Sequence, residues 1–328
     1  MLSSRPVKSI KKTVFFGTHE VAVPALETLV ELGLTPELIV TRPEAGLAPD
    51  KMSLRPAEVF PHPVKDWAEA REIPLVRSRQ ATEPALLERI QKIKPDLILV
   101  ADYGRDLPAE IRNTARRAVL QVHPSCLPKL GGTHAIRVAL GQGDRKTGVT
   151  VFLVDDEPYL GPILLSEEIP LEGQETYGEI VPQVQDLARQ LLAEAITRVE
   201  KSKKPKTRKP NPKTATRTPR ITVRHRRAPW QLEAPEVYNR WRAYSPPGLT
   251  TSIRLKTVEI VKGGVLPSTN APFGETGTYL GMRGGRLAVL CGRQTMFGIE
   301  EVRLKGHGQL TASDAAEILG LKVADQFV

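Results

Sequence analysis

Cysteine, aromatic residues and long apolar runs are all scarce in this sequence of 328 residues. The two cysteines, Cys126 and Cys291, lie far apart, which excludes a disulfide scaffold, a zinc ribbon and an iron–sulfur cluster, and no metal site is predicted. Aromatic residues make up 5% of the chain, too few for a protein that mainly stacks the bases of single strands. No apolar run reaches the roughly 18 to 20 residues that cross a bilayer, so we expect a soluble protein without a membrane partner.

Acidic residues are absent from the segment between residues 201 and 227, which holds twelve Lys or Arg. The net charge of the chain is +10, so the remainder carries −2 and nearly all the basic excess lies in this segment. A polyanion such as RNA is one expected partner, and its predicted contacts are Lys203, Lys204, Lys206, Arg208 and Lys209. A solvated linker with a basic bias explains the charge equally well.

The first thirteen residues, MLSSRPVKSIKKT, also lack acidic residues and include four basic ones. Transit peptides to mitochondria share this bias, although they are usually longer and amphipathic. We therefore predict that residues 1–12 are a basic N-terminal tail or the remnant of a presequence, and that the protein is located in the mitochondrial matrix. A frayed basic terminus is the alternative.

The length of the chain suits two domains. In the first, over residues 13–200, short apolar runs alternate with segments of helical period. Strands are predicted at residues 13–18, 37–41, 74–76, 95–101, 118–123 and 148–154, and helices at residues 20–33, 65–73, 83–92 and 176–200. This alternation predicts an α/β fold with a doubly wound parallel sheet. The proline-rich stretch between residues 42 and 65 is predicted to be a functional loop.

A change of composition marks the second half of the chain. Residues 201–220 hold four prolines and no large apolar side chain before residue 220, which predicts an extended linker. In residues 221–328, short strands alternate with glycine turns, a pattern typical of a small antiparallel barrel. Thr311 is predicted to cap a terminal helix that ends at Gly320.

Ligands of an open α/β sheet bind beyond the carboxyl ends of its strands, so the loops that follow the strands form the candidate site. One loop begins at His123, which closes a buried strand and precedes the segment PSCLP. A histidine there can donate to a developing oxyanion or take up a proton near neutral pH. A histidine held by backbone carbonyls in a turn is the alternative. The chain has no G-x-G-x-x-G motif and no P-loop, which disfavours oxidoreduction with a nucleotide cofactor.

These segments together resemble the methionyl-tRNA formyltransferase family over nearly the whole chain. The resemblance rests on VFFGTHEVAVPALETL at 14–29, PVK at 63–65, VADYGRDLP at 100–108, LQVHPSCLP at 120–128, GDRKTGVT at 143–150, GPIL at 161–164, and PRIT and YNRWRAYSP beyond the linker. It implies a Rossmann-like catalytic domain followed by an OB-like β-barrel. The implied reaction is formyl transfer from 10-formyltetrahydrofolate to the amine of methionine on initiator tRNA, a step of translation initiation.

The family places Asn and His two residues apart at one strand end, with an Asp from the loop of the next strand. The resemblance assigns these catalytic positions to Gln121, His123 and Tyr159. Gln121 keeps an amide donor but is one methylene longer, which shifts its aim. Tyr159 is no carboxylate, because the reference pKa of a phenol is about 10. Asp156 or Glu157 would take the place of the Asp if the loop slid by two or three residues.

The resemblance assigns the folate-binding loop to Tyr103, Gly104, Leu107 and Pro108. The family has apolar residues after its Tyr–Gly pair, whereas this chain has Arg105 and Asp106. An ion pair of these two inside the pocket would occlude the folate, and side chains that face solvent would leave the pocket intact. The early loop with which the family grips the tRNA acceptor end offers only four basic residues here, Arg42, Lys51, Arg55 and Lys65.

Two functions are consistent with these residues. The first is a divergent mitochondrial methionyl-tRNA formyltransferase, which uses 10-formyltetrahydrofolate as co-substrate and tRNA as partner. The second is a catalytically impaired relative that serves as an RNA-binding or structural component, for example on an organellar ribosome with its ribosomal RNA. The replacements at Gln121 and Tyr159 favour lost or weakened chemistry, and a carboxylate within hydrogen-bond reach of the His123 ring would favour activity.

Overall fold

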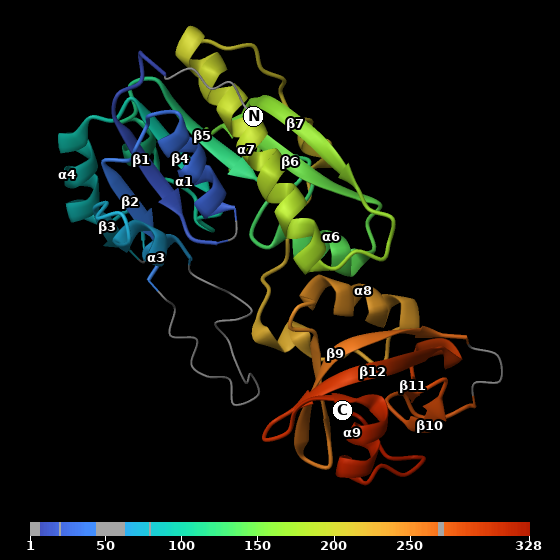
Figure 1. Cartoon of the computed structure of the whole chain (residues 1–328). Coiled ribbons are helices and arrows are strands. Elements are labelled where there is room, and N and C mark those ends of the chain that lie inside the picture. Colours follow the sequence, from blue (N-terminus) through green and yellow to red (C-terminus); the bar gives the residue numbers. More distant parts are fainter. Residues whose placement is uncertain (1–6, 20, 44–62, 79, 268–271) are drawn as a thin grey trace.

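The computed structural model describes residues 7–19, 21–43, 63–78, 80–267 and 272–328. Figure 1 shows an α/β domain, coloured from blue to yellow, and a C-terminal domain in orange and red. Helix α8 (Ala234–Tyr244) lies where the two domains meet and packs against both α6 (Ala135–Gln142) and β9 (Lys256–Leu266). The two-part organisation expected from the composition is therefore visible in the fold.

A seven-stranded sheet forms the centre of the α/β domain, in the order β3-β2-β1-β4-β5-β6-β7. Its strands are β1 (Thr13–Gly17), β2 (Leu38–Thr41), β3 (Leu75–Arg77), β4 (Leu97–Ala101), β5 (Ala118–His123), β6 (Lys146–Leu153) and β7 (Ile163–Pro170). The first five strands are parallel, as predicted, but β6 runs antiparallel to β5, and β7 antiparallel to β6. The chain turns back because α6 lies beyond the carboxyl end of β5 and does not cross over to the other end of the sheet. The predicted parallel sheet is therefore confirmed for its first five strands, and β6 and β7 extend it in antiparallel pairs.

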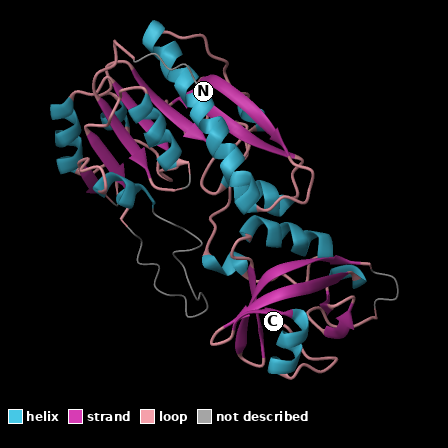
Figure 2. Cartoon of the chain, in the orientation of Figure 1, coloured by secondary structure: helices cyan, strands magenta, loops and turns pink. Residues whose placement is uncertain are grey.

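Helices cover both faces of this sheet, as expected for a doubly wound fold (Figure 2). Successive residues of β1 and β4 point to opposite faces, so Phe15 and Leu99 enter one core and Phe16 and Val100 the other. The first core includes buried residues of α1 (Ala22–Glu31), α3 (Pro63–Glu69), α6 and α7 (Tyr177–Lys201), and the second includes those of α4 (Pro84–Ile93) and α5 (Ala109–Arg112).

The C-terminal domain is built on an antiparallel sheet in the order β10-β11-β12-β9-β8, with β13 paired to β12. Besides β9, its strands are β8 (Leu249–Ile253), β10 (Tyr279–Arg283), β11 (Arg286–Leu290), β12 (Met296–Leu304) and β13 (Gly308–Thr311). Within the described ranges no ladder joins β8 to β10, so backbone pairing does not close the sheet. The predicted cap of α9 (Ala312–Leu319) is confirmed, because the Thr311 hydroxyl accepts from the Asp314 N–H and Gly320 ends the helix at φ +58°.

Elements that were not expected from the pattern include α5, α6, β7 and α8. Helix α5 is a single turn, too short to show a period. Helix α6 buries Arg137 beside its apolar residues, which blurs the boundary between its two faces. Strand β7 lies at the edge of its sheet, and three consecutive residues in its middle are exposed, so no alternation is visible.

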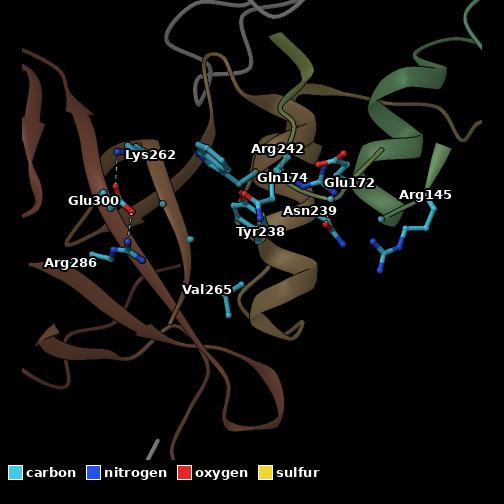
Figure 3. A pocket seen from close by; sticks show the side chains of 15 residues that line it. Arg145, Glu172, Gln174, Tyr238, Asn239, Arg242, Lys262, Val265, Arg286 and Glu300 are labelled. Carbon is cyan, nitrogen blue, oxygen red and sulfur yellow. Dashed lines mark hydrogen bonds and ion pairs between the residues drawn. The ribbon is translucent and has the colours of Figure 1, made fainter. Parts of the chain in front are cut away.

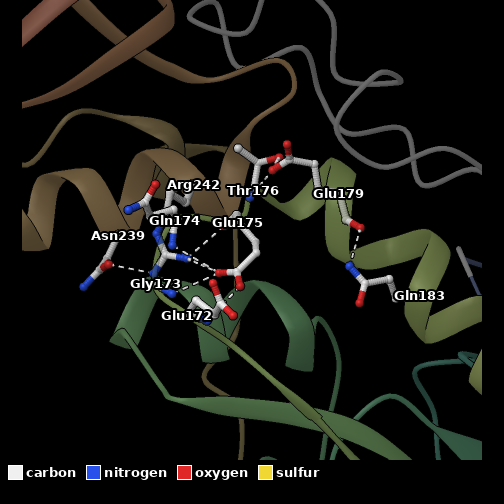
Figure 4. A network of polar contacts seen from close by, with 9 residues as sticks. All are labelled: Glu172, Gly173, Gln174, Glu175, Thr176, Glu179, Gln183, Asn239 and Arg242. Carbon is white, nitrogen blue, oxygen red and sulfur yellow. Dashed lines mark hydrogen bonds and ion pairs between the residues drawn. The ribbon is translucent and has the colours of Figure 1, made fainter.

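Buried arginines hold the two domains together across α6 and α8. Arg137 of α6 donates to the Ala243 carbonyl at 2.7 Å. Arg242 of α8 donates to the Glu175 carbonyl and to the Asn239 side chain, both at 2.8 Å (Figure 4). Both guanidinium groups are almost fully buried, and charge-assisted hydrogen bonds compensate the cost of burying them. These contacts fix the orientation of the C-terminal domain on the α/β domain.

Parts of the predicted tail and linker are bound to the α/β domain. The N–H groups of Lys11 and Lys12 donate to the Asp96 carboxylate at 2.9 and 3.2 Å. In the linker, Arg208 exchanges two backbone hydrogen bonds of 2.8 Å with Ile163 of β7. The last residues of the tail and this part of the linker are therefore anchored, where a free extended segment was expected. Residues 1–6 lie outside the described part of the chain.

Candidate active site

Strand β5 presents two of the predicted site residues side by side. Gln121 and His123 share one face of the sheet, because alternate residues of a strand do so. Their partners across the antiparallel pair are Phe152 and Thr150 of β6. Gln121 is half-buried and its side chain has no hydrogen-bond partner within the described residues, whereas His123 is only 3% exposed. The predicted pair therefore lies at the carboxyl end of β5.

Tyr159 reaches the same place by a route that differs from the predicted one. Because β6 is antiparallel to β5, the carboxyl ends of the two strands lie at opposite ends of the sheet. The loop after β6 must therefore fold back over the sheet to reach His123. It places the Tyr159 ring 5.0 Å from the His123 ring, centroid to centroid, at an angle of 56°. A Cβ atom on Gly131 would lie 2.9 Å from the Tyr159 Cβ, so only glycine permits this approach. His123 and Tyr159 are therefore close, as expected for residues that follow adjacent strands, although the two strands run in opposite directions.

Burial keeps the His123 ring neutral. Its pKa is lowered from 6.5 to about 4, chiefly because burial disfavours the charged form, and the nearby Arg217 cation acts in the same direction. Nε2 lies 3.0 Å from the Leu130 carbonyl oxygen. Such a contact was expected for a histidine that is held by backbone carbonyls in a turn. Because a carbonyl only accepts, Nε2 carries the hydrogen and Nδ1 keeps its lone pair. The ring can therefore accept a proton at Nδ1.

No carboxylate of the described chain hydrogen-bonds to the His123 ring. Asp156 forms an ion pair with Arg112 at 2.5 Å, and its side chain is 92% exposed. Glu157 is exposed as well. The sliding of the loop that would bring either residue to the position of the family Asp does not occur. Tyr159 lies against the His123 ring instead, and burial raises its pKa to about 12, so the phenol is neutral.

The buried, neutral His123 predicts a loss of stability at low pH. An unfolded imidazole takes up a proton near pH 6.5, whereas the folded protein resists protonation until about pH 4. Above pH 6.5 the imidazole is neutral in both states. As the pH falls to 4, protonation of the unfolded state should lower the free energy of unfolding by about 3 kcal/mol. Urea unfolding at about pH 7 and about pH 4.5 should show a smaller pH effect in His123→Gln than in the wild type. The exposed His307→Gln is the control, and an unchanged pH effect in His123→Gln would contradict the prediction.

A cation from the linker completes the cluster, and the sequence offers no local signal for it. The guanidinium carbon of Arg217 lies 4.8 Å from the Tyr159 ring centroid. Its Nη2 donates to the Pro158 carbonyl, and residues 216–218 exchange backbone hydrogen bonds of 2.9 and 3.0 Å with Gly131. Arg217 therefore lies over the Tyr159 ring, which in turn lies tilted against the His123 ring, and we call these three residues the linker clamp.

The predicted folate-binding residues follow β4 but differ in exposure. Tyr103 is fully buried, with its ring centroid 5.3 Å from that of Phe16 in an edge-to-face arrangement, and burial raises its pKa to about 12. Its hydroxyl has no hydrogen-bond partner among the described residues. Leu107 is also buried, whereas Gly104, at φ +72°, and Pro108 are half-exposed. The Tyr103 and Leu107 side chains thus support the loop from the core, and Gly104 and Pro108 are the two accessible members of the set.

Arg105 and Asp106 do not occlude this loop. Both side chains are exposed, and the described ion pairs include none between them. The backbone N–H groups of residues 103–107 make no hydrogen bond to other described residues. Unpaired backbone donors beside a turn fit a polar ligand such as the pterin of a folate. The arrangement corresponds to the open alternative of the sequence analysis.

Next to this loop lies a histidine pair that the sequence analysis did not single out. The His19 and His134 rings are 5.7 Å apart, and Arg42 Nη2 lies 3.3 Å from His19 Nε2. Burial lowers the pKa of Arg42, and the Arg105 cation adds to this effect. Of the four basic residues expected to grip tRNA, Arg42 is thus engaged with a histidine, Lys65 belongs to α3, and Lys51 and Arg55 lie outside the described residues.

A polar groove of about 680 Å³ lies between the two domains, away from the linker clamp (Figure 3). On its C-terminal side, Glu300 is shared by Lys262 at 2.9 Å and Arg286 at 2.8 Å. Its other wall includes Arg145 and Arg242, so four cations line the groove against the carboxylates of Glu172 and Glu300. None of the predicted catalytic, folate-binding or RNA-binding residues lines it.

The five linker residues predicted to bind RNA are all exposed. Of these, Arg208 is anchored through its backbone alone, which leaves its side chain facing solvent. The remaining four are lysines with no ion pair or side-chain hydrogen bond to the described residues. Exposure of five uncompensated cations agrees with either interpretation, a polyanion site or a solvated linker, so RNA binding stays a prediction.

The described residues show neither a membrane-spanning nor a metal-binding element. No helix there is long and apolar enough to cross a bilayer, and no three His, Cys, Asp or Glu are grouped so that they could hold a metal ion. The two cysteines are free thiols. Burial raises the pKa of Cys126 to about 11 and that of Cys291 to about 12. Both thiols are therefore protonated at neutral pH and are poor nucleophiles.

Comparisons with known proteins agree with this architecture. The Formyl transferase family matches residues 15–196, and the Formyl transferase, C-terminal domain family matches residues 220–319. The methionyl-tRNA formyltransferase of Syntrophus aciditrophicus is 33% identical over 80% of this chain and 83% of its own length. That of a Synechococcus species is 30% identical over 96% of this chain and 98% of its own length.

Among solved structures, the fold is shared with an N-formyltransferase from Helicobacter canadensis in complex with folinic acid and dTDP-3-aminofucose. The TM-score is 0.62 at 16% identity, over 88% of this chain and 98% of that one. HypX from Aquifex aeolicus in complex with tetrahydrofolic acid gives a TM-score of 0.57 at 17% identity, over 97% of this chain and 49% of that one.

Both halves of the chain thus have counterparts in the same relatives, in the same order. The comparisons give no support to the alternative of a catalytically impaired relative kept as an RNA-binding or structural component. The parallel-dominated α/β sheet, the antiparallel C-terminal sheet and the matched sequence all point the same way. The chain belongs to the methionyl-tRNA formyltransferase family.

Proposed function

We propose that the chain transfers a formyl group from 10-formyltetrahydrofolate to the amine of methionine on initiator tRNA. The observation that carries this proposal is the neutral His123 at the end of β5, with Nε2 fixed by the Leu130 carbonyl and Nδ1 left as an acceptor. Family membership supplies the reaction class, because relatives that cover nearly the whole chain are named for it. The co-substrate supplies the formyl group.

The residues around His123 suit this chemistry. The formyl carbon exchanges its bond to the folate nitrogen for a bond to the amine nitrogen, and the amine proton passes through Nδ1 of His123 to the leaving nitrogen. The Gln121 amide, on the same face of β5, donates to the oxygen on which negative charge develops. A base works best when its pKa is close to the ambient pH. His123 titrates at about 4, so we expect formyl transfer that is slow for want of a carboxylate partner.

The experiment that tests the function compares three acceptors. Methionine-charged initiator tRNA, methionine-charged elongator tRNA and free methionine are each incubated with the protein and 10-formyltetrahydrofolate. We expect formylation of the charged initiator tRNA alone, because binding energy from the tRNA body positions the amine. Equal rates with free methionine, or no product with any acceptor, would contradict the proposal.

Folate binding follows from the exposure of Arg105 and Asp106. Because these side chains leave the loop open, calorimetric titration with a tetrahydrofolate analogue should give binding in the low-micromolar range, about 8 kcal/mol. Arg105→Leu with Asp106→Leu should change the affinity by no more than about threefold, since neither side chain is expected to fill the site. A much tighter complex with the double variant would show that the two residues obstruct the pocket after all.

We further propose that the linker binds the tRNA backbone through Lys203, Lys204, Lys206, Arg208 and Lys209. Lys and Arg that neutralise phosphates release counterions, so affinity should fall with salt by a slope of roughly 0.9 per phosphate on duplex RNA-like targets. Replacing all five by Gln should reduce both the affinity and this slope, with little effect on the fold because the side chains are exposed. Unchanged RNA binding at physiological salt would mean that the segment is only a solvated connector.

We propose a mitochondrial location from the basic residues 1–12, and a partnership with an organellar ribosome from the basic segment 201–227. Both are secondary to the formyl-transfer proposal. Import into isolated mitochondria of the full chain, compared with a chain in which Arg5, Lys8, Lys11 and Lys12 are replaced by Gln, tests the first. Equal import of the two chains would contradict it.

A further inference from the structure

The linker clamp covers His123, the proposed base, with two residues that come from different parts of the chain. Tyr159 lies on the His123 ring, and Arg217 lies on the Tyr159 ring. His123 is left 3% exposed. Arg217 is itself exposed, although it donates to the Pro158 carbonyl and lies over an aromatic ring. The outermost member of the linker clamp is therefore a cation that solvent can reach.

We propose that Arg217 is a positioning residue that closes the site over His123 through Tyr159, and that RNA backbone phosphates release it. The functional consequence, that the site opens when the tRNA substrate binds, rests on the proposed function. The clamp itself rests only on the described contacts of Arg217, Tyr159 and His123.

Phosphate is the ligand class that competes best for this arginine. A cation–π contact and one bond to a neutral carbonyl are weak at an exposed site, whereas a guanidinium and a phosphate form two charge-assisted hydrogen bonds. Arg217 also lies among exposed basic residues, with Lys213 and Arg220 on either side of it. These neighbours raise the local concentration of a polyanion at the segment. RNA drawn to the linker would thus meet the guanidinium that holds Tyr159.

The backbone of Tyr159 explains why release would open the site. Its φ is +62°, a left-handed conformation that a tyrosine rarely adopts. The ring contact with His123, the Arg217 cation over the ring and the close approach to Gly131 hold the residue there. Removal of Arg217 takes away one of these supports, so Tyr159 should leave His123 more often.

The experiment measures access to His123 and not catalysis. Diethyl pyrocarbonate modifies neutral imidazoles, and peptide mass spectrometry gives a rate for each histidine. His307, which is exposed, serves as the fast reference, and His19, which is buried outside the clamp, reports general loosening of the domain. Wild type, Arg217→Gln and Arg220→Gln are compared with and without a saturating uridylate oligomer. Arg220→Gln is the matched control, because it removes the same charge from the same segment.

In the wild type, His123 should react slowly, and the oligomer should raise its rate about tenfold. A factor of this size is expected when an exposed cation–π contact and one hydrogen bond are lost. Arg217→Gln should show the raised rate without RNA and no further increase with it. Arg220→Gln should behave as the wild type. Three results would overturn the inference: an unchanged His123 rate in Arg217→Gln, a wild-type rate that RNA does not change, or an equal rise at His19. Because no step requires formyl transfer, an inactive protein would still give the clamp result, so failure of the function and failure of the clamp are distinguishable.

Discussion

Replacing His123 by Asn is expected to lower the rate of formyl transfer by about 100-fold or more. The variant keeps a polar side chain of similar size at the end of β5 but loses the lone pair that accepts the amine proton. Binding of charged initiator tRNA and of the folate should change little, because the residues proposed to bind them lie elsewhere in the chain. The loss should therefore appear in kcat and not in KM.

His307→Asn is the control for this prediction, because His307 is exposed on the C-terminal domain and its replacement should leave kcat unchanged. Rates are measured at saturating folate with charged initiator tRNA. A His123→Asn protein as active as the wild type would show that His123 is a structural residue held by the Leu130 carbonyl, as its hydrogen bond alone would suggest.

The second large effect is a gain, expected from Tyr159→Asp. A carboxylate at this position faces His123, favours its protonated form and raises its pKa from about 4 towards the ambient pH. The base then works closer to its optimum, and we expect kcat to rise about tenfold. Aspartate also tolerates the left-handed backbone at this position better than tyrosine does.

Tyr159→Phe is the matched control, since it keeps the ring between Arg217 and His123 and removes only the hydroxyl. Its rate and the His123 pKa, followed by NMR titration of the imidazole carbons, should stay close to those of the wild type. A Tyr159→Asp protein with an unchanged His123 pKa would show that the carboxylate does not reach the ring. An equal gain in Tyr159→Phe would assign the effect to the hydroxyl.

Much of the fold follows from the sequence because it rests on local patterns. The apolar runs of β1 and β4 are typical of strands buried on both faces, and the period of α7 matches one packed face. The direction of β6 does not follow from such patterns, because a strand has the same alternation in either direction. The amphipathic pattern of α6 is hidden in the sequence by Arg137. This residue is buried because tertiary contacts with α8 compensate its charge.

The site was only partly predictable, because local spacing shows which residues share a strand but not which distant segments meet. His123 and Gln121 are two residues apart on one strand, so their common face follows from the period of the strand. The position of Tyr159 against His123 follows from the resemblance to the family. The path of the loop that carries Tyr159 there depends on the antiparallel direction of β6, which the sequence does not show. Arg217 lies far from Tyr159 in the sequence, and no local spacing could indicate that a linker arginine stacks on it. Contacts between distant segments are fixed by packing, which a single sequence does not display.

Formylation under single-turnover conditions tests the central claim most directly. The protein is in excess over methionine-charged initiator tRNA, 10-formyltetrahydrofolate is saturating, and the product is N-formylmethionine released from the tRNA. Product release then cannot limit the rate, so even slow chemistry at His123 becomes visible. We predict a single exponential formation of N-formylmethionine that goes to completion and is at least about 100-fold slower in His123→Asn. Product formation no faster than in a reaction without protein, with both substrates shown to be bound, would contradict the account.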